Sequence, residues 1–182
     1  FITATNASHS KNTERDDRRD FVLRVSEHRK GDFAYWEALN AHITGGGAAA
    51  MMYDLLAMDL TDFNVRRKPH TKALTDQKLR SLDPIPNWWY DCLQRGEVSD
   101  EQGWPAFIGT TQAIEGIKEL AGHRLYQNPT AGDVVRTMLE MCPSAMKKQS
   151  SEKHNRKRGL SLPLLEQARA EFESYIGGSI TW

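Results

Sequence analysis

The stretch K-K-Q-S-S-E-K-H-N-R-K-R-G-L, residues 147–160, decides the fold of the second half of the chain. It holds six lysines and arginines and one acid, Glu152, although the whole chain has 24 basic and 24 acidic residues and a formal net charge of zero. A segment this polar stays in solvent, and Gly159-Leu160 ends it as the return strand of a hairpin would. We therefore expect a basic, hairpin-like segment between two short extended pieces.

Helical signals lie on both sides of this segment. Thr130 has the side chain of an N-cap residue, and Thr110 or Thr111 is expected to cap the helix before it. Pro163 opens a last helix, in which apolar residues recur at helical spacing. Two helices, a basic loop between extended pieces and a packing helix are the parts of a winged helix-turn-helix module. We expect a mainly α protein with a winged-helix-like DNA-binding domain over residues 69–182.

The basic segment predicts contact with nucleic acid. Each phosphate that it neutralises would release counterions, which gives an affinity that depends on salt and little on sequence. The helix from Thr130 to Cys142 is the candidate for groove contact, but only Arg136 extends from its middle, so base readout is not expected. The alternative is a solvated charged loop without a partner. The candidate DNA-binding residues are Lys147, Lys148, Lys153, Arg156, Lys157, Arg158 and Arg136.

The first 25 residues are expected to form a strand, a charged loop and a second strand. Phe1-Ile2-Thr3-Ala4-Thr5-Asn6 is a short apolar strand that ends in a polar Asn, and Phe21–Val25 has the composition of the second strand. Arg18-Arg19 lies directly before that second strand. In ring-forming phosphate hydrolases an Asn so placed can orient the attacking water. A paired Arg can stabilise charge on a phosphoryl group held by the neighbouring subunit.

Residues 32–69 predict two helices and a domain boundary. Asp32 is expected to be an N-cap, and Gly45-Gly46-Gly47 predicts either a tight turn between helices or a backbone nest for an anion. The helix from Ala48 to Leu60 is apolar over most of its circumference, which predicts burial between neighbours. The basic run Arg66-Arg67-Lys68-Pro69 marks the boundary, which we place after residue 68.

Several other classes of site and segment are not expected. The phosphate-binding motif G-x-x-x-x-G-K-[ST] occurs nowhere in the chain. Cys92 and Cys142 have no C-x-x-C neighbour and no two histidines stand at helical i, i+4 spacing, so no metal site is predicted. No apolar run approaches the length of about 18 residues that crosses a bilayer. We expect a cytoplasmic protein without a membrane partner.

In their order along the chain, these motifs resemble the C-terminal half of the primase-helicase replication proteins of bacteriophages and mobile elements. The motor of that family is a superfamily 3 helicase of the AAA+ class, and the resemblance covers nearly the whole chain. The matching residues are Phe1–Asn6, Asp17-Arg18-Arg19, Asp32–Trp36, Gly45-Gly46 with Tyr53–Leu56, Asp59-Leu60 with Phe63-Asn64, and Pro69, Thr71, Ala73-Leu74 and Gln77-Lys78. Near the end of the chain, the residues similar to the closing helix and final strand of the family are Arg158-Gly159, Leu162-Pro163, Leu165, Ala168-Arg169, Phe172 and Ile180-Trp182.

The resemblance implies a nucleotide site shared with residues upstream of Phe1. Asn6 would be the sensor residue, and Arg18 or Arg19 would be the arginine finger, with Arg19 favoured because it lies nearer the strand. Residues 1–68 would be the trailing strands and helical lid of the motor. The full-length protein would bind ATP and Mg²⁺, form a hexameric ring and translocate on single-stranded or forked DNA in replication. This part alone is not expected to hydrolyse ATP.

Two rival functions come from other classes. One is a stand-alone winged-helix DNA-binding or regulatory module without nucleotide chemistry, whose DNA binding would not depend on Arg18 or Arg19. The other is an acid-base hydrolase that uses Glu14, Asp16 or Asp17. The second is disfavoured because carboxylates in an arginine-rich loop form ion pairs, which lower their pKa and suit general-acid work poorly.

Overall fold

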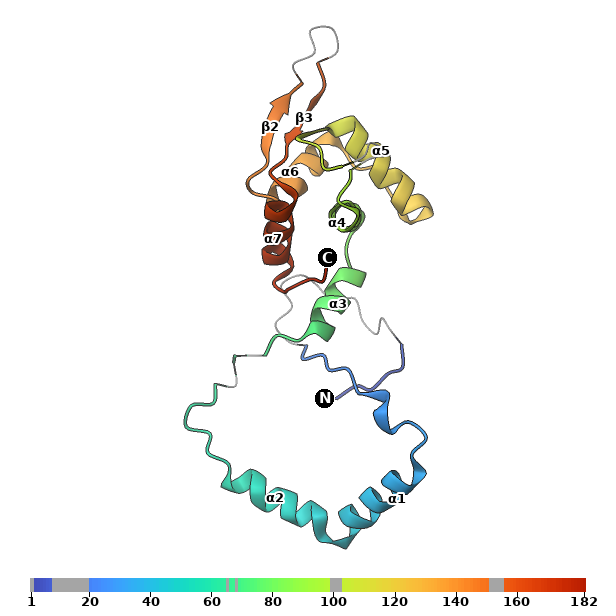
Figure 1. Cartoon of the computed structure of the whole chain (residues 1–182), viewed down its shortest axis with the longest axis vertical. Coiled ribbons are helices and arrows are strands. Elements are labelled where there is room, and N and C mark those ends of the chain that lie inside the picture. Colours follow the sequence, from blue (N-terminus) through green and yellow to red (C-terminus); the bar gives the residue numbers. More distant parts are fainter. Residues whose placement is uncertain (1, 8–19, 65, 68, 99–102, 151–155) are drawn as a thin grey trace. The chain divides into compact units, whose positions relative to one another are not determined.

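The computed structural model describes residues 2–7, 20–64, 66–67, 69–98, 103–150 and 156–182. The chain divides into two compact units, one formed by Phe21–Pro69 and the other by Phe1–Asp20 together with His70–Trp182. The described residues are mainly helical, as the sequence predicts, and they also contain a small three-stranded sheet (Figure 1). Within these residues, no helix combines the length and the apolar character that a membrane crossing needs.

The unit Phe21–Pro69 contains a short 3₁₀ turn and two α-helices. The turn is Glu27–Arg29, and the helices are α1 (Phe33–His42) and α2 (Ala48–Ala57). Asp32 caps α1 as predicted, because its carboxylate accepts a hydrogen bond of 3.0 Å from the backbone N–H of Tyr35. The glycine triplet kinks the chain between the helices inside the wide turn Ile43–Gly47, where Gly46 has a φ of 110°. Glycine adopts that φ without a steric penalty, so the triplet acts as a joint.

Three expectations for this half of the chain are wrong within the described residues. Residues 2–7 and 21–25 form neither helix nor strand, and α2 buries none of its residues. A strand needs a neighbour that completes its hydrogen-bond ladder, and no described segment pairs with these residues. The large apolar side chains of the unit are instead exposed, notably Leu23, Phe33, Met51, Tyr53, Leu56 and Phe63.

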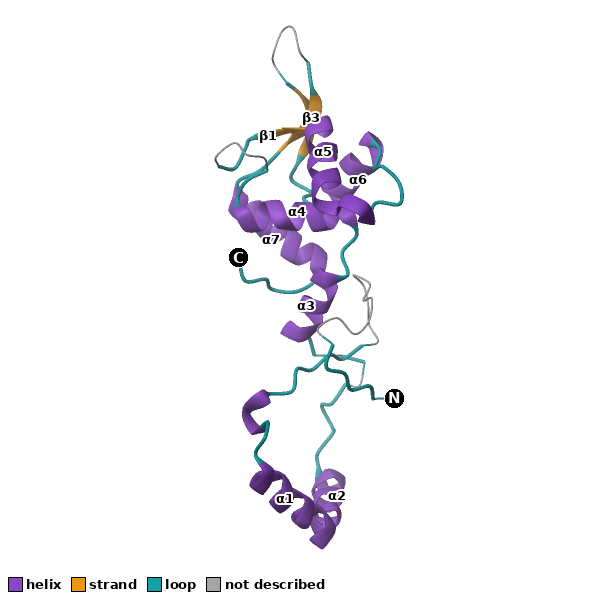
Figure 2. Cartoon of the chain, turned by 90° about the vertical axis from the view of Figure 1, so that its right-hand side faces the viewer, coloured by secondary structure: helices purple, strands orange, loops and turns teal. Residues whose placement is uncertain are grey.

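The second unit is built from five helices, one short 3₁₀ turn and the sheet, as far as the described residues show. The order is α3 (Lys72–Arg80), α4 (Pro84–Arg95), β1 (Phe107–Gly109), α5 (Thr110–Ala121), the 3₁₀ turn Gly122–Arg124, α6 (Ala131–Met141), β2 (Met146–Gln149), β3 (Arg158–Ser161) and α7 (Leu165–Ile176). All strand pairs are antiparallel in the spatial order β1-β3-β2. Figure 2 shows the sheet beside α5, with which both β1 and β3 make contact.

Two adjacent tryptophans on α4 lie at the centre of this unit. Trp88 is 2% exposed and Trp89 is fully buried, and they pack with Ile117 of α5, Met138 of α6 and Phe172 of α7. These rings are therefore core residues and not a platform for stacked bases. A Cβ at Gly116 would stand 2.5 Å from Nε1 of Trp88, which explains a glycine inside α5.

The helices α4 and α5 begin in different ways, and the predicted cap of α5 by Thr110 or Thr111 is wrong. Pro84 is the first residue of α4. A proline is tolerated there because the first N–H groups of a helix have no intrahelical acceptor. Neither threonine caps α5, whose N-cap residue is Gly109. The hydroxyl of Thr110 instead donates to the carbonyl of Arg158 at 3.1 Å, which ties α5 to β3.

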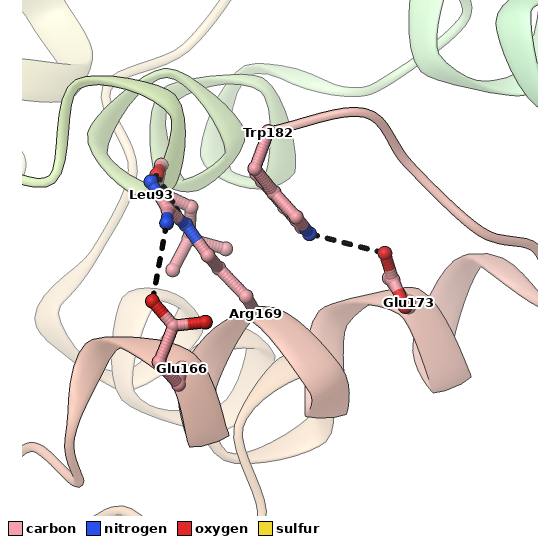
Figure 3. Close-up of polar contacts among 5 residues, drawn as sticks. All are labelled: Leu93, Glu166, Arg169, Glu173 and Trp182. Carbon is pink, nitrogen blue, oxygen red and sulfur yellow. Dashed lines mark hydrogen bonds and ion pairs between the residues drawn. The ribbon is translucent and has the colours of Figure 1, made fainter.

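The end of the chain is held against α7 by side-chain hydrogen bonds (Figure 3). Oε1 of Glu173 accepts from Nε1 of Trp182 at 3.0 Å and from the backbone N–H of Ile180 at 2.9 Å. The guanidinium of Arg169 donates twice to the carbonyl of Leu93, at 2.8 and 3.1 Å, and lies over the Trp182 ring. The last residues therefore do not form the final strand that the resemblance implies. The N–H groups of the Ile180 backbone and the Trp182 ring donate to Glu173 of α7 instead.

Gly159→Ala is expected to destabilise the second unit. A Cβ at Gly159 would overlap the carbonyl oxygen of Ile108, so β1 and β3 would have to move apart, at a cost of about 1–3 kcal/mol. Gly109→Ala is the matched control, because Gly109 pairs with Gly159 and its nearest neighbour lies 4.0 Å away. Thermal unfolding followed by circular dichroism should show a lower Tm for Gly159→Ala alone. Equal transitions for the two variants would contradict the close approach.

Candidate nucleic-acid interface

An open groove with a volume of about 1770 Å³ lies between the hairpin of β2 and β3 and the first turns of α5 and α6. Three separate parts of the sequence form its walls. The residues that line it include Thr110, Thr111, Gln112 and Glu115 of α5, Ala131, Gly132, Val135, Arg136 and Leu139 of α6, and Lys147, Lys148, Gln149, Ser150, Arg156, Lys157, Arg158 and Gly159 of the hairpin. The fold thus brings the basic segment to face two helices.

Six of the seven residues that the sequence predicts to bind DNA line this groove. They are Arg136, Lys147, Lys148, Arg156, Lys157 and Arg158, and all six are exposed. The seventh, Lys153, lies outside the described residues. Glu115 is the only acid among the described residues that line the groove. The groove is therefore strongly positive, although the chain as a whole is neutral.

The hairpin presents its cations on paired backbone. Lys148 stands opposite Gly159 and Gln149 opposite Arg158 in the β2–β3 register. Beyond the strands the pairing continues, because the N–H of Ser150 donates to the carbonyl of Lys157 at 2.9 Å. The N–H of Lys157 in turn donates to the hydroxyl of Ser150 at 3.0 Å. The backbone under these cations is thus fixed by hydrogen bonds on both sides.

Within the described part of the chain, none of the five hairpin cations lies within 4.0 Å of an acidic oxygen. Since like charges on neighbouring positions repel, an anion bound in the groove would relieve this repulsion. A second explanation is that lysines on the edge strand β2 discourage pairing with another sheet. That explanation covers Lys147 and Lys148 but not the three cations on the side of β3.

Arg136 differs from the hairpin cations because it has a partner on its own helix. Its Nη2 lies 2.8 Å from Oδ1 of Asp133. The hydroxyl of Thr130 donates to Oδ2 of Asp133 at 2.7 Å and accepts from the Asp133 N–H at 3.2 Å, so Thr130 caps α6 as predicted. The hydrogen bond from Thr130 lowers the pKa of Asp133, with a further contribution from Arg136. The carboxylate is therefore ionised at neutral pH and holds the guanidinium that was expected to reach out.

The residues predicted for nucleotide chemistry are not brought together in the described structure. Asn6 is exposed and does not line the groove. Arg18 and Arg19 lie outside the described residues, as do the acids of the hydrolase alternative. No cluster of three or more His, Cys, Asp or Glu in the described residues could hold a metal ion. Burial raises the pKa of the Cys92 thiol, and that of Cys142, to about 12, so both thiols are protonated at neutral pH.

Sequence reasoning missed the helix residues that complete the groove. Thr111, Gln112 and Glu115 stand on the first turns of α5, and Val135 and Leu139 form part of the α6 wall. The polar triplet Thr110-Thr111-Gln112 at the start of a helix is a sequence signal from which the α5 side of the groove could have been predicted. Searches against known protein families, curated proteins and solved structures found no match for this chain.

Thr130→Ala is expected to raise the pKa of Asp133 towards its ordinary value of 3.8. The same change removes an N-cap, at a cost of about 1 kcal/mol. The stability that ionised Asp133 contributes is present above pH 3.8 and is lost as pH falls through its lowered pKa, and Thr130→Ala should shift that loss upwards. NMR titration of the Asp133 carboxyl carbon measures the shift, with Thr137→Ala on the same helix as control. An Asp133 pKa that Thr130→Ala does not change would contradict the assignment.

Proposed function

We propose that residues 69–182 form a winged-helix-like DNA-binding domain whose groove receives the phosphate backbone. Support comes from the order of its elements, in which two helices, α5 and α6, are followed by the β2–β3 hairpin, and from a sheet in the order β1-β3-β2. The gathering of six exposed cations in one groove is the observation that carries the proposal. In this reading the hairpin is the wing.

The chemistry of the groove fits an extended polyanion better than a small anion. Its cations stand along both sides of the hairpin, Lys147 and Lys148 on one side and Arg156, Lys157 and Arg158 on the other, instead of converging on one point. A row of lysines and arginines neutralises successive phosphates and releases counterions from each. The affinity would then be strong at low salt and fall steeply as salt is added.

Replacing Arg156, Lys157 and Arg158 together by Gln should weaken DNA binding. Loss of three phosphate contacts lowers the magnitude of the slope of log K against log salt by about 2.7. Fluorescence anisotropy with labelled DNA, measured between about 50 and 200 mM salt, gives both quantities. The control carries Lys72→Gln, Arg95→Gln and Lys118→Gln, which remove the same charge from described positions outside the groove. Equal binding by the two triple variants would remove the wing assignment.

We propose, second, that residues 1–68 belong to the motor of a phage or mobile-element primase-helicase. The resemblance of the sequence motivates this proposal, and one structural observation favours it. The helices α1 and α2 bury none of their residues within the described chain, and they expose side chains such as Phe33, Tyr53 and Leu56. Exposed apolar faces of this kind suit elements that pack against a larger body. Asn6 would position the attacking water and Arg18 or Arg19 would act on a neighbouring subunit of a ring, with ATP and Mg²⁺ bound.

Joining a nucleotide-binding half upstream should produce ATP hydrolysis that depends on the finger arginine. Replacing Arg19 by Ala should lower turnover by about 10³-fold. The control variant Arg24→Ala should leave turnover unchanged. Mixing subunits that carry Arg19→Ala with subunits that carry Asn6→Ala should restore part of the activity, because each mixed interface can hold one intact site. Full turnover of the Arg19 variant would transfer the role to Arg18. If neither arginine matters, the stand-alone DNA-binding module is the better description.

A further inference from the structure

We infer that the hairpin alone supplies the DNA contact, that its target is duplex DNA, and that α6 reads no bases because its own Asp133 neutralises it. This inference rests on the proposed DNA-binding function of the groove, and it specifies which element of the groove contacts the DNA. Three observations carry it, concerning the groove-facing side chains of α6, the charge at the start of α6 and the aromatic rings of the groove.

The side of α6 that lines the groove is poor in groups that recognise bases. Ala131, Gly132, Val135 and Leu139 carry no side-chain donor or acceptor. Arg136 is the one polar side chain that α6 contributes to the groove among the described residues. Direct readout of base edges uses Arg, Lys, Asn, Gln and acids that are free to form paired hydrogen bonds. The side of α6 that lines the groove can therefore contact DNA but cannot distinguish one base pair from another.

The N-terminus of α6 is already occupied by an anion of the chain itself. A helix start attracts phosphate through its free N–H groups and its dipole. Here the Asp133 carboxylate stands in the first turn, where it is held by Thr130 and paired with Arg136 at 2.8 Å. The described charges of α6 are Asp133, Arg136 and Glu140, which sum to −1, whereas the described hairpin residues carry five cations and no acid. A phosphate is therefore drawn to the hairpin and repelled by α6.

The aromatic rings of the groove are engaged in packing. Trp104 and Phe107 are the only aromatic residues among the described groove residues, and both are half-buried. Nε1 of Trp104 donates to the carbonyl of Pro163 at 2.8 Å, and its ring lies 5.4 Å from that of Trp89. The Phe107 ring lies against β3 at Gly159. Single-strand binders stack bases on free aromatic rings, whereas a duplex offers its phosphates without that need.

Asp133→Asn tests the inference on the whole chain. The amide keeps an acceptor for Thr130 but loses the charge, which frees Arg136 for a phosphate. Binding to a 20-base-pair duplex at low salt should tighten about threefold, and the salt slope should steepen by about 0.9. Adding Arg136→Gln to this variant should cancel the gain. Glu140→Gln, an equal charge change on α6 outside the groove residues, should tighten binding less.

A second measurement needs no variant. The unmodified chain should bind duplexes of unrelated sequence within about threefold of one another and bind single strands of the same sequences more weakly. A preference for single strands, a strong sequence preference, or an affinity that Asp133→Asn leaves unchanged or weakens would overturn the inference while leaving DNA binding in place. Absence of binding to any DNA at low salt would instead overturn the proposed function on which it rests.

Discussion

The packing of Trp88 and Trp89 among α4, α5, α6 and α7 is the constraint on which the unit His70–Trp182 depends. The two rings together fill the space between four helices, and neither exposes more than 2% of its surface. Aromatic side chains contribute the largest apolar areas of a core, so loss of either would leave a large cavity. Because Gly116 admits Trp88 against the backbone of α5, the position of α5 follows from that of α4. The sheet is placed in turn by its contacts with α5.

A second constraint positions the charged surface. The central strand β3 approaches β1 so closely that only glycine fits at position 159, and the Thr110 hydroxyl fixes the start of α5 to the same strand. The hairpin cations are therefore attached to a rigid frame, although their side chains extend into solvent. Within the described residues these charges have no carboxylate partner, so they repel one another, and that repulsion supports the proposed binding of a polyanion. The same reasoning separates the hairpin from α6, whose arginine already has a partner.

Local signals in the sequence were reliable where the physics is local. The caps at Asp32 and Thr130 form as predicted because a side-chain oxygen reaches an N–H group two or three residues away in any context. The predicted hairpin forms, and the tryptophan pair is core. The predictions failed where a distant partner is required. The segments 2–7 and 21–25 have strand composition but no described strand beside them, and α2 has an apolar surface but nothing described that covers it.

The sequence by itself determined the mainly helical character, the capped starts of α1 and α6, the basic hairpin and the identity of six groove cations. Only the tertiary structure decided that these cations face α5 and α6 across one groove and that Thr110 bonds to β3 instead of capping its helix. It also decided that position 159 must be glycine, because a Cβ there would overlap the carbonyl oxygen of Ile108. The physical reason is the range of the interactions. Capping and charge density act over a few residues, whereas a groove built from three separate segments exists only after the tryptophan core has packed its helices together.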